Sequence, residues 1–265
     1  GGPMDTTKGT GLCNAFQLKL LALAVMMLDH TNIIFGPNTV PDWLHFISRF
    51  VSPLFAFLVV EGFFHTHDRR RYALRLWGVG LFVAAGNLVV GQLTNHPVSL
   101  MSHTIILTLA LGYSVIWAID EGRRQGGAKG GRLLALAAAL GIAGALLAPV
   151  EGFVQVLFVM LASYLLHDAK GGRAKLCLCL VLGSAALACL YTPILHPSTA
   201  SAVDWEMSLG LNADWAQFMA VPFILLYNGE RGPKGALSKW LFYLGYPAHL
   251  WAFAVIGMLL GIPSL

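Results

Sequence analysis

The sequence predicts an all-α membrane protein, a polytopic transmembrane bundle of about nine helices. Of its 265 residues, 57% are apolar and only 11% are Asp, Glu, Lys or Arg, less than half the charged fraction typical of soluble domains. Mean hydropathy is +0.68, and apolar runs recur close to the roughly 20 residues that a helix needs to cross a bilayer. This composition argues against a soluble enzyme and excludes a disordered chain, a disulfide scaffold and a nucleic-acid-binding domain.

Polar residues, glycine and proline separate the apolar runs. We expect a single integral-membrane domain over residues 1–265, in which residues 1–3, before Met4, are a cloning remnant. The span at 132–148 is short and rich in Ala and Gly, and the apolar part of the span at 213–227 would cover only about 20 Å. In order, the expected spans are 16–36, 43–64, 72–92, 101–119, 132–148, 151–167, 175–193, 213–227 and 238–260.

The basic residues divide unevenly between the connections of these spans. Four alternate connections, at 36–42, 93–100, 149–151 and 194–212, contain no Lys or Arg. The positive-inside rule therefore predicts a cytoplasmic N-terminus, and nine spans then put the C-terminus in the periplasm. The formal charge of +4 accordingly reflects topology. All basic residues except Arg49 fit this pattern: Lys8, Lys19, Arg69, Arg70, Arg71, Arg75, Arg123, Arg124, Lys129, Arg132, Lys170, Arg173, Lys175, Arg231, Lys234 and Lys239.

Ionisable residues at membrane depth form a first candidate site. Such residues cost about 2.5–3.5 kcal/mol each on insertion scales and usually face a bundle interior. Asp29 and His30 follow an apolar stretch in the first span, and Arg49, on the inward-running second span, falls at the same depth. His249 on the last span could supply an imidazole to the Asp29 carboxylate. Asn87 and His103 could join the same layer.

Structural readings of these residues remain open. Asp29 and Arg49 could form a buried ion pair that fixes helix register, and His30 could be a hydrogen-bonded core histidine. Arg49, Pro53, Phe57 and Glu61 recur every four residues and so predict one helical stripe. Such a stripe would line something other than lipid.

Two cytoplasmic segments are candidates for binding phosphate. Arg69, Arg70 and Arg71 are either a topogenic loop or an anion patch, because arginine donors pair bidentately with phosphate oxygens. The turn at 227–232, with Asn228 and Arg231, is a second donor-rich segment or an ordinary loop. The four cysteines lack metal-ligand spacing, so we expect no metal site and no disulfide framework.

Short motifs along almost the whole chain carry a family resemblance. They are Leu18-Lys19-Leu20, Met27-Leu28-Asp29-His30, Arg49-Phe50, Pro53 to Phe57, Glu61-Gly62-Phe63, Arg69 to Arg75, Tyr227-Asn228-Gly229, Arg231-Gly232, Phe242-Tyr243, Tyr246-Pro247 and His249-Leu250. With these motifs the chain resembles the TraX family, the F-pilin N-terminal acetylases among the polytopic transmembrane acyltransferases. Ala248 stands where the family usually has leucine.

The resemblance implies acetyl transfer from cytoplasmic acetyl-CoA to an amine, the N-terminal α-amine of a membrane-resident pilin, in the bacterial inner membrane. His30, oriented by a carboxylate, would be the base, and Asp29 and His249 would be further catalytic residues. Arg49, Asn87 or Tyr243 would stabilise the oxyanion. His103 and Tyr246 are further substrate-side candidates. CoA would be held near Arg69, Arg70, Arg71, Asn228 and Arg231, with its thioester entering along the stripe that ends at Glu61.

Several alternatives stay open within this reading. A histidine could carry the acetyl group as a covalent intermediate instead of acting as a base. The acceptor could be a hydroxyl of a surface glycan or lipid. In a different class of function, Asp29, His30 and Arg49 could form the proton path of a coupled transporter.

Overall fold

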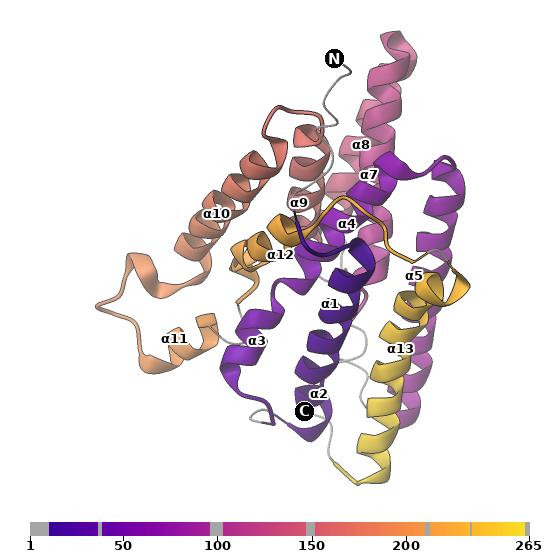
Figure 1. Cartoon of the computed structure of the whole chain (residues 1–265). Helices are drawn as coiled ribbons and strands as arrows, with labels where there is room; N and C mark the ends of the chain where they lie inside the picture. Colours follow the sequence, from indigo (N-terminus) through magenta and orange to yellow (C-terminus); the bar gives the residue numbers. More distant parts are fainter. Residues whose placement is uncertain are drawn as a thin grey trace. The chain divides into compact units, whose positions relative to one another are not determined.

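The computed structural model describes residues 11–36, 39–95, 103–146, 152–209, 213–233 and 235–262. Within these ranges the regular elements are all helical (Figure 1). One isolated β-bridge pairs Cys13 with Tyr227. The prediction of an all-α fold is therefore confirmed. The expected remnant at residues 1–3 and the basic residues Lys8 and Lys234 lie outside the described ranges.

The helices follow the predicted spans in order. The first span contains α1 (Ala15–Asp29) and α2 (Thr31–Phe35), and the second contains α3 (Asp42–Ser48) and α4 (Val51–His65). The remaining elements are α5 (Arg69–Thr94), α7 (Ile105–Gln125), α8 (Gly127–Leu146), α9 (Phe153–Leu166), α10 (Gly172–Tyr191), the 3-10 turn η1 (Pro193–Leu195), α11 (Ala202–Leu209), the 3-10 turns η2 (Ala213–Trp215) and η3 (Gln217–Ala220), α12 (Val221–Leu226) and α13 (Ala236–Leu259).

Six helical segments in the described residues are long and apolar enough to cross a membrane, as is typical of a multi-pass membrane protein. They are Trp43–His65, Arg69–Thr94, Ile105–Gln125, Gly127–Leu146, Gly172–Tyr191 and Trp240–Leu259. The other three predicted spans are shorter or interrupted. The first breaks at His30, the sixth is the 14-residue α9, and the eighth consists of η2, η3 and α12.

The second predicted span also breaks, at a position that matters for the site. α3 ends at Ser48, and α4 begins at Val51 after a two-residue turn. Pro53 lies in the first turn of α4, where the missing N–H of proline is tolerated. The prediction that Arg49, Pro53, Phe57 and Glu61 share one helix is therefore wrong for Arg49, which lies in the turn. The other three residues lie on α4.

The chain folds into two compact units. Unit 1 combines Gly1–Phe55 with Gly171–His249, and unit 2 combines Ala56–Lys170 with Leu250–Leu265. In unit 2, α7 packs against α5, α8 and α9. In unit 1, α10 packs against η2, η3 and α12. That the 265 residues act as one functional domain stays a prediction.

The N-terminal segment of unit 1 is fastened to the turn before α13. The Cys13 N–H donates to the Leu226 carbonyl at 2.9 Å, and the Asn228 N–H donates to the Cys13 carbonyl at 2.9 Å. Gly11 permits this approach, because a Cβ there would clash with the Leu226 carbonyl. Asn14 then caps α1 in a capping box with Gln17. These bonds fix where α1 starts and so position its far end.

The cytoplasmic ends predicted for unit 2 lie together. Arg69, at the start of α5, forms an ion pair with Asp120 near the end of α7. Tyr164, near the end of α9, donates a hydrogen bond to the same carboxylate at 2.9 Å. The start of α5, the end of α7 and the end of α9 therefore meet at one end of this unit. That this end is cytoplasmic stays a prediction.

Candidate functional site

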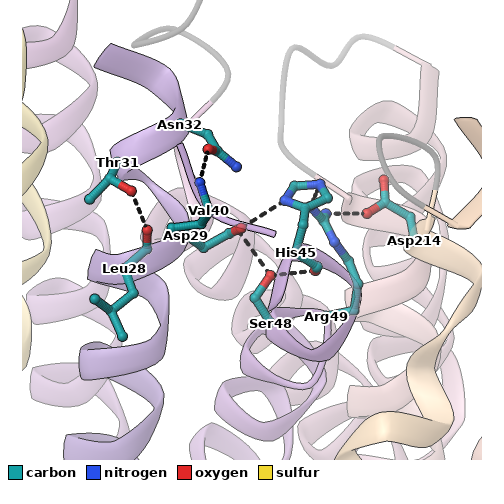
Figure 2. A network of polar contacts seen from close by, with 9 residues as sticks. All are labelled: Leu28, Asp29, Thr31, Asn32, Val40, His45, Ser48, Arg49 and Asp214. Atoms are coloured by element: carbon teal, nitrogen blue, oxygen red, sulfur yellow. Dashed lines mark hydrogen bonds and ion pairs between the residues drawn. The ribbon is translucent and has the colours of Figure 1, made fainter. Parts of the chain in front are cut away.

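A buried carboxylate joins α1 to α3 in unit 1 (Figure 2). Asp29 is only 8% exposed. Its Oδ1 lies 2.8 Å from Nδ1 of His45, and its Oδ2 accepts a hydrogen bond from the Ser48 hydroxyl at 2.9 Å. His45 and Ser48 are three residues apart on α3, so they face the same side of that helix. The imidazole and the hydroxyl offset the cost of burying this charge. The hydroxyl also lies 2.6 Å from the His45 carbonyl, so its single proton is shared between two acceptors.

His45 lies between Asp29 and Arg49. Nη2 of Arg49 contacts both ring nitrogens of His45, and Nδ1 also lies 2.8 Å from Oδ1 of Asp29. Arg49 also donates from Nη1 to Oδ1 of Asp214 at 2.7 Å. A carboxylate, an imidazole, a guanidinium and a second carboxylate therefore lie in series, and Figure 2 shows this series.

A second buried set pairs two histidines. Nδ1 of His30 lies 2.8 Å from Nε2 of His249, and Nδ1 of His249 lies 2.8 Å from the Gly245 carbonyl. A carbonyl only accepts, so His249 carries its proton on Nδ1 and accepts through Nε2. Neutral His30 accordingly donates from Nδ1 and has its basic lone pair on Nε2. The Tyr246 ring lies edge-on to both imidazoles, with centroids 6.5 and 5.9 Å away.

The structure redistributes the residues that the sequence placed at one depth. Asp29 and Arg49 contact the same imidazole, but it is that of His45 and not that of His249, which contacts His30. His45 was missed, although it lies four residues before Arg49 and would share its helical face. Nothing in the local sequence marks Asp214, because its bond to Arg49 spans 165 residues.

The candidates near the turn before α13 have structural contacts. Oδ1 of Asn228 accepts from the Glu230 N–H at 2.9 Å and so shapes the turn. Arg231 is exposed, and its carbonyl accepts from the Phe16 N–H. Tyr243, on α13, packs edge-on against the Trp240 ring at 5.9 Å. Among these, Arg231 retains an exposed charge.

The arginine run in unit 2 divides between structural and exposed roles. Arg69 pairs with Asp120 and lies over the Phe63 ring, 4.1 Å from its centroid. Arg70 and Arg71 are exposed, and Arg71 lies 3.6 Å from an oxygen of Asp68. Phosphate binding by this run would therefore fall mainly to Arg70 and Arg71.

Glu61 belongs to an aromatic cluster in the same unit. Its Oε1 lies 3.7 Å from Nε2 of His167, just after α9. The His167 ring stacks on Phe64, with centroids 3.7 Å apart, and Phe64 stacks on Tyr164. These contacts connect α4 to α9.

Asn87 and His103 lie near the opposite ends of the unit 2 helices. Asn87 has no exposed surface. Its Nδ2 donates to the His103 carbonyl at 2.9 Å, and its Oδ1 accepts from Nε1 of Trp251 at 2.9 Å. The side chain therefore ties α5 to the start of α7 and to α13. The described residues contain no group of three or more His, Cys, Asp or Glu that could hold a metal ion.

Comparisons with known proteins place this geometry in context. A family model described as TraX protein matches residues 15–257. The probable fimbrial assembly protein FimC, serogroup H1, of Dichelobacter nodosus is 26% identical over 262 residues, which cover 89% of this chain and 93% of that protein. No solved structure matches the chain.

Proposed function

The chain belongs to the TraX protein family, and from this premise we propose that it is a membrane-embedded acetyltransferase. It transfers an acetyl group from acetyl-CoA to a primary amine. The acceptor is the N-terminal α-amine of a pilin-like subunit, a choice supported by the similarity to a fimbrial assembly protein. No metal takes part in this proposal.

The observation that carries the proposal is the geometry of the buried His30–His249 pair, in which Nδ1 of His30 lies 2.8 Å from Nε2 of His249. An ammonium cannot attack a thioester, so a base must remove its proton. The carbonyl of Gly245 fixes His249, which in turn fixes His30 with its basic lone pair on Nε2. When His30 takes the proton, Nε2 of His249 still accepts from Nδ1 and stabilises the imidazolium.

The reaction then balances without a further reactant. The amine nitrogen forms a bond to the acetyl carbonyl carbon, and the carbon–sulfur bond breaks. Of the two protons that the ammonium nitrogen loses, one passes through His30 to the departing thiolate and the other is released to water. Arg49 is our candidate donor to the oxyanion that forms in between. The exposed arginines of the cytoplasmic connections, Arg70, Arg71 and Arg231, would attract the CoA phosphates.

We further propose that all nine predicted spans cross the bacterial inner membrane. The N-terminus would lie in the cytoplasm and the C-terminus in the periplasm, because the basic residues occupy alternate connections. The interrupted first span and the short eighth span would cross as broken helices, whose irregular backbone is tolerated where protein buries it.

The test is acetyl transfer by the purified protein in nanodiscs, with isotope-labelled acetyl-CoA and a peptide that has a free α-amine. We expect His30→Gln to lower kcat by about 10²–10⁴-fold, the usual contribution of a general base. His196→Gln is the matched control, because His196 is exposed in the same unit and should transfer at the wild-type rate.

Two results would contradict the proposal in different ways. Wild-type turnover by His30→Gln would remove the assignment of the base. If the protein transfers no acetyl group to peptide amines but does transfer one to glycan hydroxyls, the acceptor is a glycan. If it transfers none and shows proton-coupled flux in proteoliposomes without acetyl-CoA, the protein is a transporter. Acid-quenched mass spectrometry would reveal an acetyl-histidine if the route is covalent.

A further inference from the structure

An exposed apolar surface of unit 1 continues past the end of α10. It comprises Tyr191, the last residue of α10, Ile194 and Leu195 of η1, and Val203 and Met207 of α11. These residues are between 42% (Met207) and 60% (Leu195) exposed, and α11 packs against η1. Contiguous exposed apolar residues mark a contact with a membrane or with another protein.

This surface is continuous with an exposed apolar side of α10. Leu178, Val181, Leu182 and Leu190 of this helix are exposed, and α10 is long and apolar enough to cross a membrane. Its 20 residues rise about 30 Å, which is the thickness of the hydrocarbon core. In a spanning α10, η1 therefore begins where the acyl chains meet the headgroups. No Asp, Glu, Lys or Arg occurs at positions 176–203, so no charge separates α10 from α11.

Hydrogen bonds fix the orientation of α11. Ser201 caps this helix, because its Oγ accepts from the Asp204 N–H at 3.2 Å and its own N–H donates to Oδ2 of Asp204 at 2.8 Å. Ser208 is buried, and its carbonyl accepts from Nε1 of Trp215 at 2.9 Å. Figure 1 shows α11 running back toward α3, against which it packs, instead of continuing the direction of α10.

Val203 and Met207 form a narrow apolar stripe on α11. They are four residues apart and so share one side of the helix. Asp204 and Glu206 are exposed and flank this side. A stripe of this kind suits the boundary of a bilayer, where apolar side chains can enter the acyl chains while the neighbouring charges stay in water.

We propose that η1 and α11 form an interfacial membrane element. The side chains of Ile194, Leu195, Val203 and Met207 contact the acyl chains of the bilayer where α10 leaves it. Lipid is favoured over a protein partner, because the adjoining surface of α10 contacts lipid when that helix spans the membrane. Positions 193–209 contain no Lys or Arg, so the contact depends on apolar burial and not on anionic headgroups.

The same element is tied to the outer end of the candidate site. Trp215, which donates to the Ser208 carbonyl, directly follows Asp214, and Asp214 accepts from Arg49. Contact of α11 with lipid would therefore set the depth of the exposed Asp214 carboxylate in the membrane. The assignment of α11 to the periplasmic leaflet rests on the proposed topology, whereas the contact with lipid does not.

The test is the membrane depth of spin labels, measured by EPR power saturation in phosphatidylcholine nanodiscs. The labels are attached to Val203→Cys and Met207→Cys in a variant whose four native cysteines are replaced. We expect both labels to collide with oxygen more often than with a water-soluble nickel complex. They should report a depth of about 5–10 Å into the boundary between headgroups and acyl chains.

The matched controls are Ala202→Cys and Glu206→Cys. Each labels the exposed residue directly before one of the two test positions, and consecutive helical residues face different sides. Both control labels should collide with the nickel complex more often than with oxygen.

Two results would overturn the inference. Equal access of the nickel complex to test and control positions would make α11 a helix in water. Protection of Val203→Cys and Met207→Cys from both reagents would show that protein covers them. The proposed topology fails separately, because the depth of a label is the same in either leaflet, whereas the side from which an impermeant maleimide reaches Asp204→Cys is not.

Discussion

Asp29 and His30 are neighbours in the sequence, yet their side chains belong to different polar sets. Consecutive helical residues point about 100° apart, so Asp29 meets α3 while His30 meets α13. The rise along a helix lets the sequence place Asp29, His30 and Arg49 at one depth. It cannot select His45 over His249 as the partner of Asp29, because that choice depends on which helix lies beside α1.

A mutation at Ser48 tests whether Asp29 is a buried charge that needs both donors. Ser48 is 7% exposed, and its hydroxyl donates to Oδ2 of Asp29. We expect Ser48→Ala to lower the free energy of unfolding by about 2 kcal/mol, the scale of a hydrogen bond to a charged group. Chemical denaturation in mixed detergent micelles would measure it.

The control is Ser238→Ala, which removes a hydroxyl that donates only to backbone carbonyls of an exposed loop. This substitution should change stability by no more than about 0.5 kcal/mol. Equal stability of Ser48→Ala and the wild-type protein would show that Asp29 is protonated or solvated instead.

At the scale of helices, the sequence predicts where helical structure forms better than it predicts whether each helix is continuous. Runs of apolar residues require helices because a bilayer leaves no other partner for the backbone, and helical structure is found within each predicted span. The breaks at His30 and at Arg49-Phe50 carry no glycine or proline. The break at Arg49-Phe50 nevertheless has a local cause, because Pro53 lacks the N–H that would bond the Arg49 carbonyl and its ring crowds that carbonyl. The break at His30 has no such signal in the neighbouring sequence.

Two glycines of α5 give a paired prediction on helix packing. A Cβ on Gly86 would overlap the Trp251 ring, which cannot shift without losing its hydrogen bond to Asn87. A Cβ on Gly78 meets nothing within 4 Å. We expect Gly86→Ala to destabilise the protein by about 1–3 kcal/mol and Gly78→Ala to stabilise it by about 0.5–1 kcal/mol. Thermal unfolding midpoints would rank the variants, and a tolerated Gly86→Ala would refute the close packing of α5 on α13.

For the whole molecule, the charge pattern carries more information than the hydropathy. By hydropathy and length, six helical segments of the described residues could cross a membrane, whereas the alternation of basic connections predicts nine crossings. Long-range partners such as Asp214 follow from neither pattern, since both measures are local. The sequence therefore predicts the membrane depth of the candidate site and the types of side chain in it, but not which of these side chains contact one another.

Cysteine labelling tests the proposed topology. In a variant whose four native cysteines are replaced, we expect a cysteine at Asp204 to react with an impermeant maleimide added to spheroplasts. A cysteine at Arg70 should react only after permeabilisation, because the connection that holds it would be cytoplasmic. Both positions are exposed, and the cysteine-free protein is the blank. If both cysteines react with maleimide added from the same side, the predicted alternation of cytoplasmic and periplasmic connections is contradicted.

The two units are interleaved along the chain. The N-terminal part of unit 1 is completed by Gly171–His249, and Ala56–Lys170 of unit 2 is completed by Leu250–Leu265. At a synthesis rate of about 5–20 residues per second, α1 is made some tens of seconds before the turn that fastens it. During that interval Arg49 exists without Asp214, the carboxylate with which it pairs in the folded protein. Neither unit can therefore complete its folding until nearly the whole chain has been synthesised.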